Sequence, residues 1–92
     1  MSIDQAQELQ EAVRRVFLED LNLEIPEPEL DLLEAGIIDS LTLVGLIAGL
    51  EERWGVSVDF DTLDLEDLRS LEAISALLAR LISDDEEQRS AF

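Results

Sequence analysis

The chain has no cysteine and no histidine among its 92 residues. The first absence excludes a disulfide framework and a cysteine-based metal site. The second removes the commonest general base and the commonest metal ligand in proteins. Aromatic residues make up only 4% of the chain, so its core must consist mostly of Leu, Ile, Val and Ala. We therefore expect neither a hydrolase triad nor a zinc site.

Basic residues are also scarce, because six arginines face 23 acidic residues and the net charge is −17. Nucleic acid is not an expected ligand, since phosphate binding needs basic surface. A basic protein partner is favoured instead, although the acids can also simply keep a small domain soluble. No apolar run approaches the length of a membrane span, and no signal-peptide pattern opens the chain. We expect a cytoplasmic monomer without a membrane span.

Apolar residues recur at helical spacing in three segments, which lie within residues 3–18, 39–54 and 70–82. A shorter helical turn is expected at 63–68. Between the first two segments, Pro26 and Pro28 exclude a regular helix, and the apolar residues around them predict a connection that packs against the core. The pattern predicts an all-α fold, a small bundle of three main helices and one short helix. We expect one domain over residues 1–82 and an acidic, disordered tail over residues 83–92.

Asp39 and Ser40 stand where the second helical segment begins. Asp is a favoured N-cap residue, and a cap at Asp39 places Ser40 in the first turn, facing solvent. The helix dipole and the N–H groups of that turn favour a negative group attached there, although the charge of Asp39 opposes it. No base is present to activate Ser40, so a functional Ser40 is modified by another enzyme rather than catalytic. The same two residues are also common as simple helix caps.

A wider pattern surrounds these two residues. The chain reads GIIDSL at 36–41, LEERWGV at 50–56 and DLRSLEAI at 67–74. The first two strings resemble the Asp-Ser-Leu attachment site and the following helix of the acyl carrier protein superfamily. The third is similar to the short third helix of that superfamily, which leads into its fourth. The resemblance extends over residues 3–82.

The resemblance implies a four-helix bundle with a 4′-phosphopantetheine arm on Ser40, which Asp39 and Leu41 flank. It implies that a phosphopantetheinyl transferase installs the arm from coenzyme A, and that the thiol of the arm holds an acyl or aminoacyl group as a thioester. The further partners would be a loading ligase or acyltransferase and downstream condensing or transfer enzymes. The protein itself would be no enzyme and would have no metal site.

By the same resemblance, partners recognise the exposed face of the second helix and the loop before that helix. Fatty-acid carriers usually have acids along this face, whereas Thr42 and Gly45 stand at such places here. We therefore prefer a discrete carrier of an aminoacyl or specialised pathway, of the polyketide or nonribosomal-peptide type. A fatty-acid carrier is one alternative, and an acidic, non-covalent interaction protein is an alternative of another class. The residues expected to contact partners are Leu41, Val44, Gly45, Ala48, Glu51 and Glu52.

Three further features have structural explanations beside functional ones. For Gly45 we favour a flat patch facing a partner, and for Gly49 the close approach of a neighbouring helix. Trp54 ends the apolar stripe of its helix, so we expect it in the core rather than in a ligand-stacking site. The acid-rich residues 59–67 lack the glycine that a calcium-binding loop requires, so we expect no EF-hand.

Overall fold

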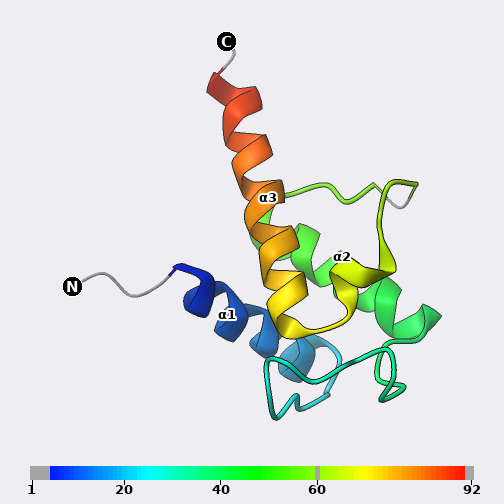
Figure 1. Cartoon of the computed structure of the whole chain (residues 1–92). Helices are drawn as coiled ribbons and strands as arrows, with labels where there is room; N and C mark the ends of the chain where they lie inside the picture. The colour runs from blue at the N-terminus through cyan, green and yellow to red at the C-terminus, as the bar shows by residue number, and fades with distance from the viewer. Residues whose placement is uncertain (1–4, 60, 91–92) are drawn as a thin grey trace.

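The computed structural model describes residues 5–59 and 61–90, and within them the chain is all-helical, with no strand. It contains α1 (Gln5–Asp20), α2 (Ser40–Trp54), the short 3₁₀ helix η1 (Leu65–Leu68) and α3 (Leu71–Ser90), as Figure 1 shows. The predicted all-α class is confirmed. The predicted short helix is a single 3₁₀ turn, so the described residues form three α-helices and one such turn.

The core is aliphatic, as the scarcity of aromatic residues predicted. Helix α1 packs against both α2 and α3, and η1 packs against α3. Phe17 is fully buried among aliphatic side chains from all these elements. Trp54 is partly buried and packs against the same core, which agrees with the structural interpretation of that residue. The fully buried aliphatic residues include Val13, Val16, Ile25, Leu32, Leu46, Leu50, Leu68, Ile74 and Leu78.

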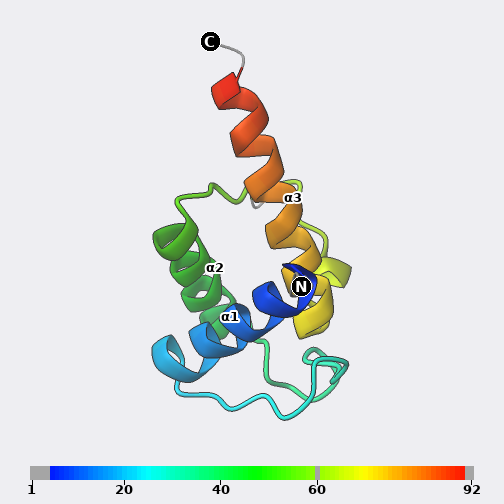
Figure 2. The ribbon, with the colours of Figure 1, turned by 90° about the vertical axis from the view of Figure 1, so that its left-hand side faces the viewer.

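Residues 21–39, which we call the pre-serine segment, connect α1 to α2 along one end of the bundle (Figures 1 and 2). Ile25 and Leu32 in this segment are fully buried. The Leu32 N–H donates to the Arg69 carbonyl oxygen at 2.7 Å, and the Glu72 N–H donates to the Pro28 carbonyl oxygen at 3.2 Å. The segment is therefore packed down, as predicted, and attached to the junction of η1 and α3.

Two helix ends lie where local chemistry predicted them. Gly55 closes α2 in the left-handed region with φ of 65°, and its N–H donates to the Glu51 carbonyl oxygen at 2.8 Å. Ser70 precedes α3, and its hydroxyl oxygen accepts a hydrogen bond from the Ala73 N–H at 3.1 Å. A glycine after the last turn and a serine before the first turn are common helix signals, which is why the sequence shows both.

Helix α3 is longer than its apolar stripe, which ends at Ile82. It continues to Ser90 and projects beyond the rest of the bundle (Figures 1 and 2). Residues 83–90 are thus helical, where the sequence led us to expect a disordered tail. They contain no proline or glycine, and Glu, Gln and Arg among them favour helix. The last two residues of that tail lie outside the described residues, and the division of the chain at residue 82 stays a prediction.

No helix within residues 5–59 and 61–90 has both the length and the apolar character needed to cross a membrane.

Candidate functional site

Asp39 caps α2 as predicted. Its backbone is extended, with φ of −124°, and its Oδ1 atom accepts a hydrogen bond from the Thr42 N–H at 2.8 Å. Its carbonyl oxygen accepts from the Leu43 N–H at 2.8 Å, which continues the helix. The hydrogen bond from the Thr42 N–H holds the pKa of Asp39 below its ordinary value, because it favours the charged carboxylate. Asp39 thus begins the helix as a carboxylate at neutral pH.

Ser40 is the first residue of α2 and its side chain is exposed. The positive end of the helix dipole lies at this turn and favours an attached phosphodiester. Asp39, the adjacent carboxylate, is already bonded to the Thr42 N–H, and the chain has no histidine. Ser40 is therefore accessible to another enzyme but has no base that would make it a nucleophile by itself.

The part of the chain that the structure describes has two clefts, and both are lined by residues other than Ser40. One cleft of about 420 Å³ lies between α1 and the pre-serine segment, with Arg14, Ile25 and Pro28 in its lining. Another, of about 210 Å³, lies between α3 and the chain that follows α2. The side chains that the structure describes also contain no acidic cluster able to hold a metal ion.

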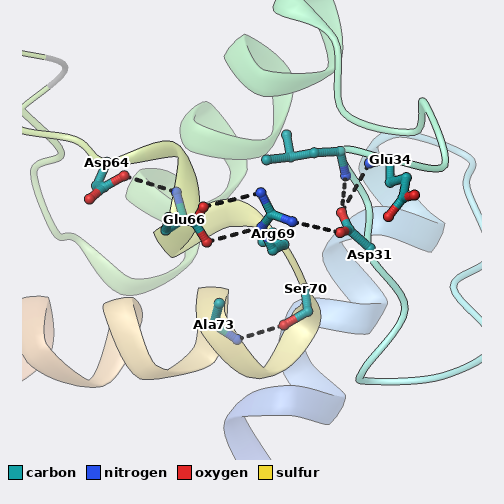
Figure 3. A network of polar contacts seen from close by, with 8 residues as sticks. Asp31, Glu34, Asp64, Glu66, Arg69, Ser70 and Ala73 are labelled. Carbon is teal, nitrogen blue, oxygen red and sulfur yellow. Dashed lines mark hydrogen bonds and ion pairs between the residues drawn. The ribbon is translucent and has the colours of Figure 1, made fainter.

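A tight turn in residues 31–36 precedes the serine. Asp31 Oδ1 accepts hydrogen bonds from the Leu33 N–H at 3.1 Å and the Glu34 N–H at 2.9 Å. Its Oδ2 atom lies 2.8 Å from Arg69 Nη1, as Figure 3 shows. Neither Asp31 nor Arg69 is among the residues that the sequence predicted to be functional. The turn contact of Asp31 could have been predicted from the sequence, since an aspartate commonly bonds the N–H groups of the turn that follows it. Its pairing with Arg69 could not, because the two residues are 38 positions apart.

The outer face of α2 begins beside Ser40 and is apolar. Leu41 is 82% exposed and Val44 is 58% exposed, and residues three apart are neighbours on one helix face. Ala48 and Glu52 are also exposed on this helix. These four residues occupy the face opposite Leu46, Ile47 and Leu50, which belong to the core. We call Leu41, Val44 and Ala48 the outer apolar face of α2.

The two glycines of α2 allow close approach by α1, at Gly49, and by Leu21, the residue after α1, at Gly45. A Cβ atom on Gly49 would lie 2.9 Å from Val16 Cγ1 and 2.7 Å from Asp20 Oδ2, so the packing explanation of Gly49 is confirmed. A Cβ atom on Gly45 would lie 2.7 Å from Leu21 Cδ2. The structure thus gives Gly45 a packing explanation too, whereas the sequence led us to favour a patch for a partner.

Glu51 is less available to a partner than the sequence suggested. It is half-buried, and its Oε2 atom accepts a hydrogen bond from the Val58 N–H at 2.9 Å. This bond attaches the chain after α2 to the last turns of that helix. Glu52 has no such role in the described contacts and is exposed. Thr42, which stands at a place where fatty-acid carriers usually have an acid, is half-buried.

Comparison with known proteins identifies the family of this chain. Residues 11–78 match the model of a family described as the phosphopantetheine attachment site. The chain is also 38% identical over 69 residues to a 4-methyl-3-hydroxyanthranilic acid carrier protein of Streptomyces anulatus, a match that covers 75% of this chain and 87% of that protein. The chain belongs to the phosphopantetheine attachment site family, and it is a carrier protein rather than an enzyme.

Proposed function

We propose that Ser40 is the residue that bears the 4′-phosphopantetheine arm, with Asp39 and Leu41 as its motif flanks. The observation that carries this proposal is the position of Ser40, exposed and directly after the Asp39 cap at the positive end of α2. Ser40 also lies within the residues that match the family. Two other serines in the same range are less accessible, since Ser70 is half-buried and bonded to the Ala73 N–H, and Ser75 is buried.

The attachment step is a phosphoryl transfer from coenzyme A. The Ser40 oxygen forms a bond to the phosphorus of the pantetheine phosphate, and the bond from that phosphorus to the rest of the coenzyme breaks. Adenosine bisphosphate leaves, and the hydroxyl proton of Ser40 goes to a base of the transferase, because this chain has no histidine to accept it. The other product is the protein with one new thiol at the end of its arm.

The absence of cysteine gives this proposal a clean test. The protein without its arm should contain no thiol, and the arm should add one per chain. We expect incubation with coenzyme A and a broad-specificity phosphopantetheinyl transferase to add the mass of one arm and one thiol. Ser40→Ala should gain neither and keep its helical circular dichroism, because Asp39 still caps α2. A matched control is Ser57→Ala, which removes another exposed serine and should accept the arm normally.

We further propose that the arm carries a carboxylic acid of a specialised biosynthetic pathway, loaded by a ligase as a thioester. The similarity to a carrier of 4-methyl-3-hydroxyanthranilic acid supports an aromatic acid as the first candidate. The alternative is a carrier of fatty-acid synthesis. The apolar outer face of α2 argues against it, because fatty-acid carriers usually have acids along this face. Incubation of the arm-bearing protein with ligases for aromatic acids, amino acids and fatty acids, followed by measurement of the loaded mass, distinguishes these cargoes.

Partners are proposed to contact the outer apolar face of α2 and Glu52. Large exposed aliphatic side chains beside the attachment residue support this proposal. We also propose that partners contact Gly45 and Glu51. Both residues have structural contacts as well, since Leu21 packs next to Gly45 and the Val58 N–H donates to Glu51. The partners are a phosphopantetheinyl transferase, a loading ligase or acyltransferase, and downstream condensing or transfer enzymes. A cytoplasmic location and a monomeric state stay predictions.

A further inference from the structure

Arg69 lies between η1 and α3 and connects them to the pre-serine segment. On one side its Nε atom is 3.0 Å from Glu66 Oε2, and its Nη2 atom donates to Glu66 Oε1 at 3.1 Å. On the other side its Nη1 atom donates to Asp31 Oδ2 at 2.8 Å (Figure 3). Two parallel bonds to Glu66 fix the plane of the guanidinium group, and that plane then directs Nη1 at Asp31.

The Asp31 carboxylate is the centre of the turn that precedes Ser40. One of its oxygens binds the N–H groups of Leu33 and Glu34, while the other binds Arg69. The turn ends at Gly36, whose φ of 73° lies in the left-handed region that glycine adopts without strain. The contact with Arg69 therefore acts on the carboxylate around which the whole turn is built.

The turn leads directly to the cap of α2. The Leu32 carbonyl oxygen accepts hydrogen bonds from the Ile37 N–H at 2.9 Å and from the Ile38 N–H at 3.2 Å. The Leu32 N–H, in turn, donates to the carbonyl oxygen of Arg69 at 2.7 Å. Arg69 thus holds the segment twice, by its side chain at Asp31 and by its backbone at Leu32, a few residues before Asp39 and Ser40.

We infer that Arg69 is a positioning residue for the carrier reactions: its ion pair with Asp31 fixes the pre-serine segment against η1 and so presents Ser40 in one orientation. This inference rests on the proposed attachment at Ser40. An ion pair at the surface adds little to global stability, and here the Arg69 side chain is 45% exposed and the Asp31 side chain 27% exposed. Its loss therefore affects mainly the order of the segment and the recognition of Ser40, not the melting temperature.

The test compares two variants that remove the pair with one matched control. Arg69→Gln removes the positive partner, and Asp31→Asn removes the negative one but keeps an oxygen that can still accept from Leu33 and Glu34. The control is Arg80→Gln, which removes a similar surface pair, between Arg80 Nη2 and Asp67 Oδ1 at 3.1 Å, that includes no residue of the pre-serine segment. Arg69→Gln and Arg80→Gln change the net charge equally, whereas Asp31→Asn changes it in the opposite direction.

Amide hydrogen exchange of Ile37 and Ile38 is the first measurement, and the kinetics of arm attachment are the second. Both variants of the pair should exchange these amides faster by about fivefold, the size expected for loss of one exposed ion pair. Both variants, as substrates of the transferase, should also have a lower kcat/KM for arm attachment, mainly through a higher KM. Their melting temperatures should stay close to that of Arg80→Gln. The double variant should add little to either single one, because all three lose the same contact.

Two outcomes would overturn the inference. One is that Arg69→Gln matches Arg80→Gln in amide exchange and in kcat/KM while the unaltered protein accepts the arm at Ser40. The other is that Arg69→Gln and Asp31→Asn change kcat/KM in opposite directions, since recognition would then follow net charge rather than the pair. Failure of the attachment proposal is a different result, in which the unaltered protein accepts no arm at Ser40. The exchange of Ile37 and Ile38 still decides in that case whether Arg69 holds the segment.

Discussion

At the scale of single residues, two neighbours at the start of α2 have different roles: Asp39 caps the helix, and Ser40 is the proposed attachment residue. Asp39 shapes the helix through its bond with the Thr42 N–H, and Ser40 stays exposed. The sequence predicted both positions because capping is local, with the acceptor and the donor three residues apart. The same reasoning did not reveal that Glu51 binds the Val58 N–H or that Asp31 binds Arg69. Those contacts depend on how the chain returns on itself, which periodicity does not encode.

Replacement of Asp39 tests the capping task separately from the attachment. Asp39→Ala should lower the melting temperature by about 5 °C, since it leaves a first-turn N–H without its acceptor. Asp39→Asn should cost much less at pH 7, because an amide oxygen can also accept that bond. Thermal melting of both variants is the measurement, and equal losses for Ala and Asn would contradict the capping role.

The pH dependence of the same variants has a definite sign. The folded pKa of Asp39 lies below its ordinary value. Its charged form therefore stabilises the fold above the unfolded pKa of about 3.9, and this contribution is lost as the pH falls through the folded pKa. The difference in melting temperature between the unaltered protein and Asp39→Asn should accordingly shrink in acid. A difference that grows between pH 5 and pH 3 would contradict this assignment.

At the scale of elements, α2 is approached closely at two glycines, by α1 at Gly49 and by the following residue, Leu21, at Gly45. Arg53 strengthens the contact between α1 and α2, with Nη2 at 2.8 Å from Glu19 Oε1 and at 3.1 Å from Asp20 Oδ1. The sequence located both helices and the packing role of Gly49. It could not show that Leu21, which follows α1, lies against Gly45, because helical periodicity does not extend into a connection.

The two glycines should respond differently to alanine. Each replacement gains about 1 kcal/mol of helix propensity. At Gly49 the new methyl group meets Asp20 Oδ2 and the fully buried side chain of Val16, and overpacking of this kind costs about 1–3 kcal/mol. At Gly45 it meets the end of the Leu21 side chain, which is only half-buried. Urea unfolding should show Gly49→Ala destabilised by about 1 kcal/mol and Gly45→Ala nearly unchanged; the reverse order would contradict this packing.

The outer apolar face of α2 leads to a prediction about partners. Burial of apolar surface contributes about 25 cal/mol per Å², so a bulky charged group at Ala48 should prevent that burial and abolish most loading at every salt concentration. Ala79→Arg, which adds the same group at an exposed position on α3, is the matched control and should load normally. Glu51→Gln/Glu52→Gln should lose loading chiefly at low salt, because charge mainly accelerates encounter.

Loading rates of these arm-bearing variants with the cognate ligase decide between two kinds of recognition. If Ala48→Arg loads like the unaltered protein while the paired Gln variant fails, recognition is electrostatic. The departure of α2 from the fatty-acid pattern would then have no functional meaning.

At the scale of the whole molecule, charge is the dominant feature. The net charge of −17 belongs to a chain of 92 residues with a radius of gyration of 13.1 Å. Arg14, Arg53, Arg69 and Arg80 form ion pairs with acidic residues, but 23 acids far outnumber six arginines. Repulsion among acids should therefore outweigh the attraction within these exposed pairs.

Salt should consequently stabilise the fold. The Debye length is about 10 Å at 0.1 M ionic strength, which is shorter than the smallest extent of the molecule, 22 Å, so NaCl screens repulsion across it. We expect the melting temperature to rise by a few degrees between 10 mM and 200 mM NaCl, because the Debye length shortens over this range from about 30 Å to less than about 8 Å. A flat or falling melting temperature would show that the acids are already well separated or compensated.

The central claim is that this carrier bears its arm on Ser40, and peptide mapping of the arm-bearing protein tests it most directly. The chain has no lysine, and cleavage after Arg15 and Arg53 releases residues 16–53, in which Ser40 is the only serine. We predict that the mass of one phosphopantetheine appears on this fragment, that fragmentation assigns it to Ser40, and that the other fragments keep their unmodified masses. An arm found on any other fragment, or on Thr42 within this one, would contradict the account.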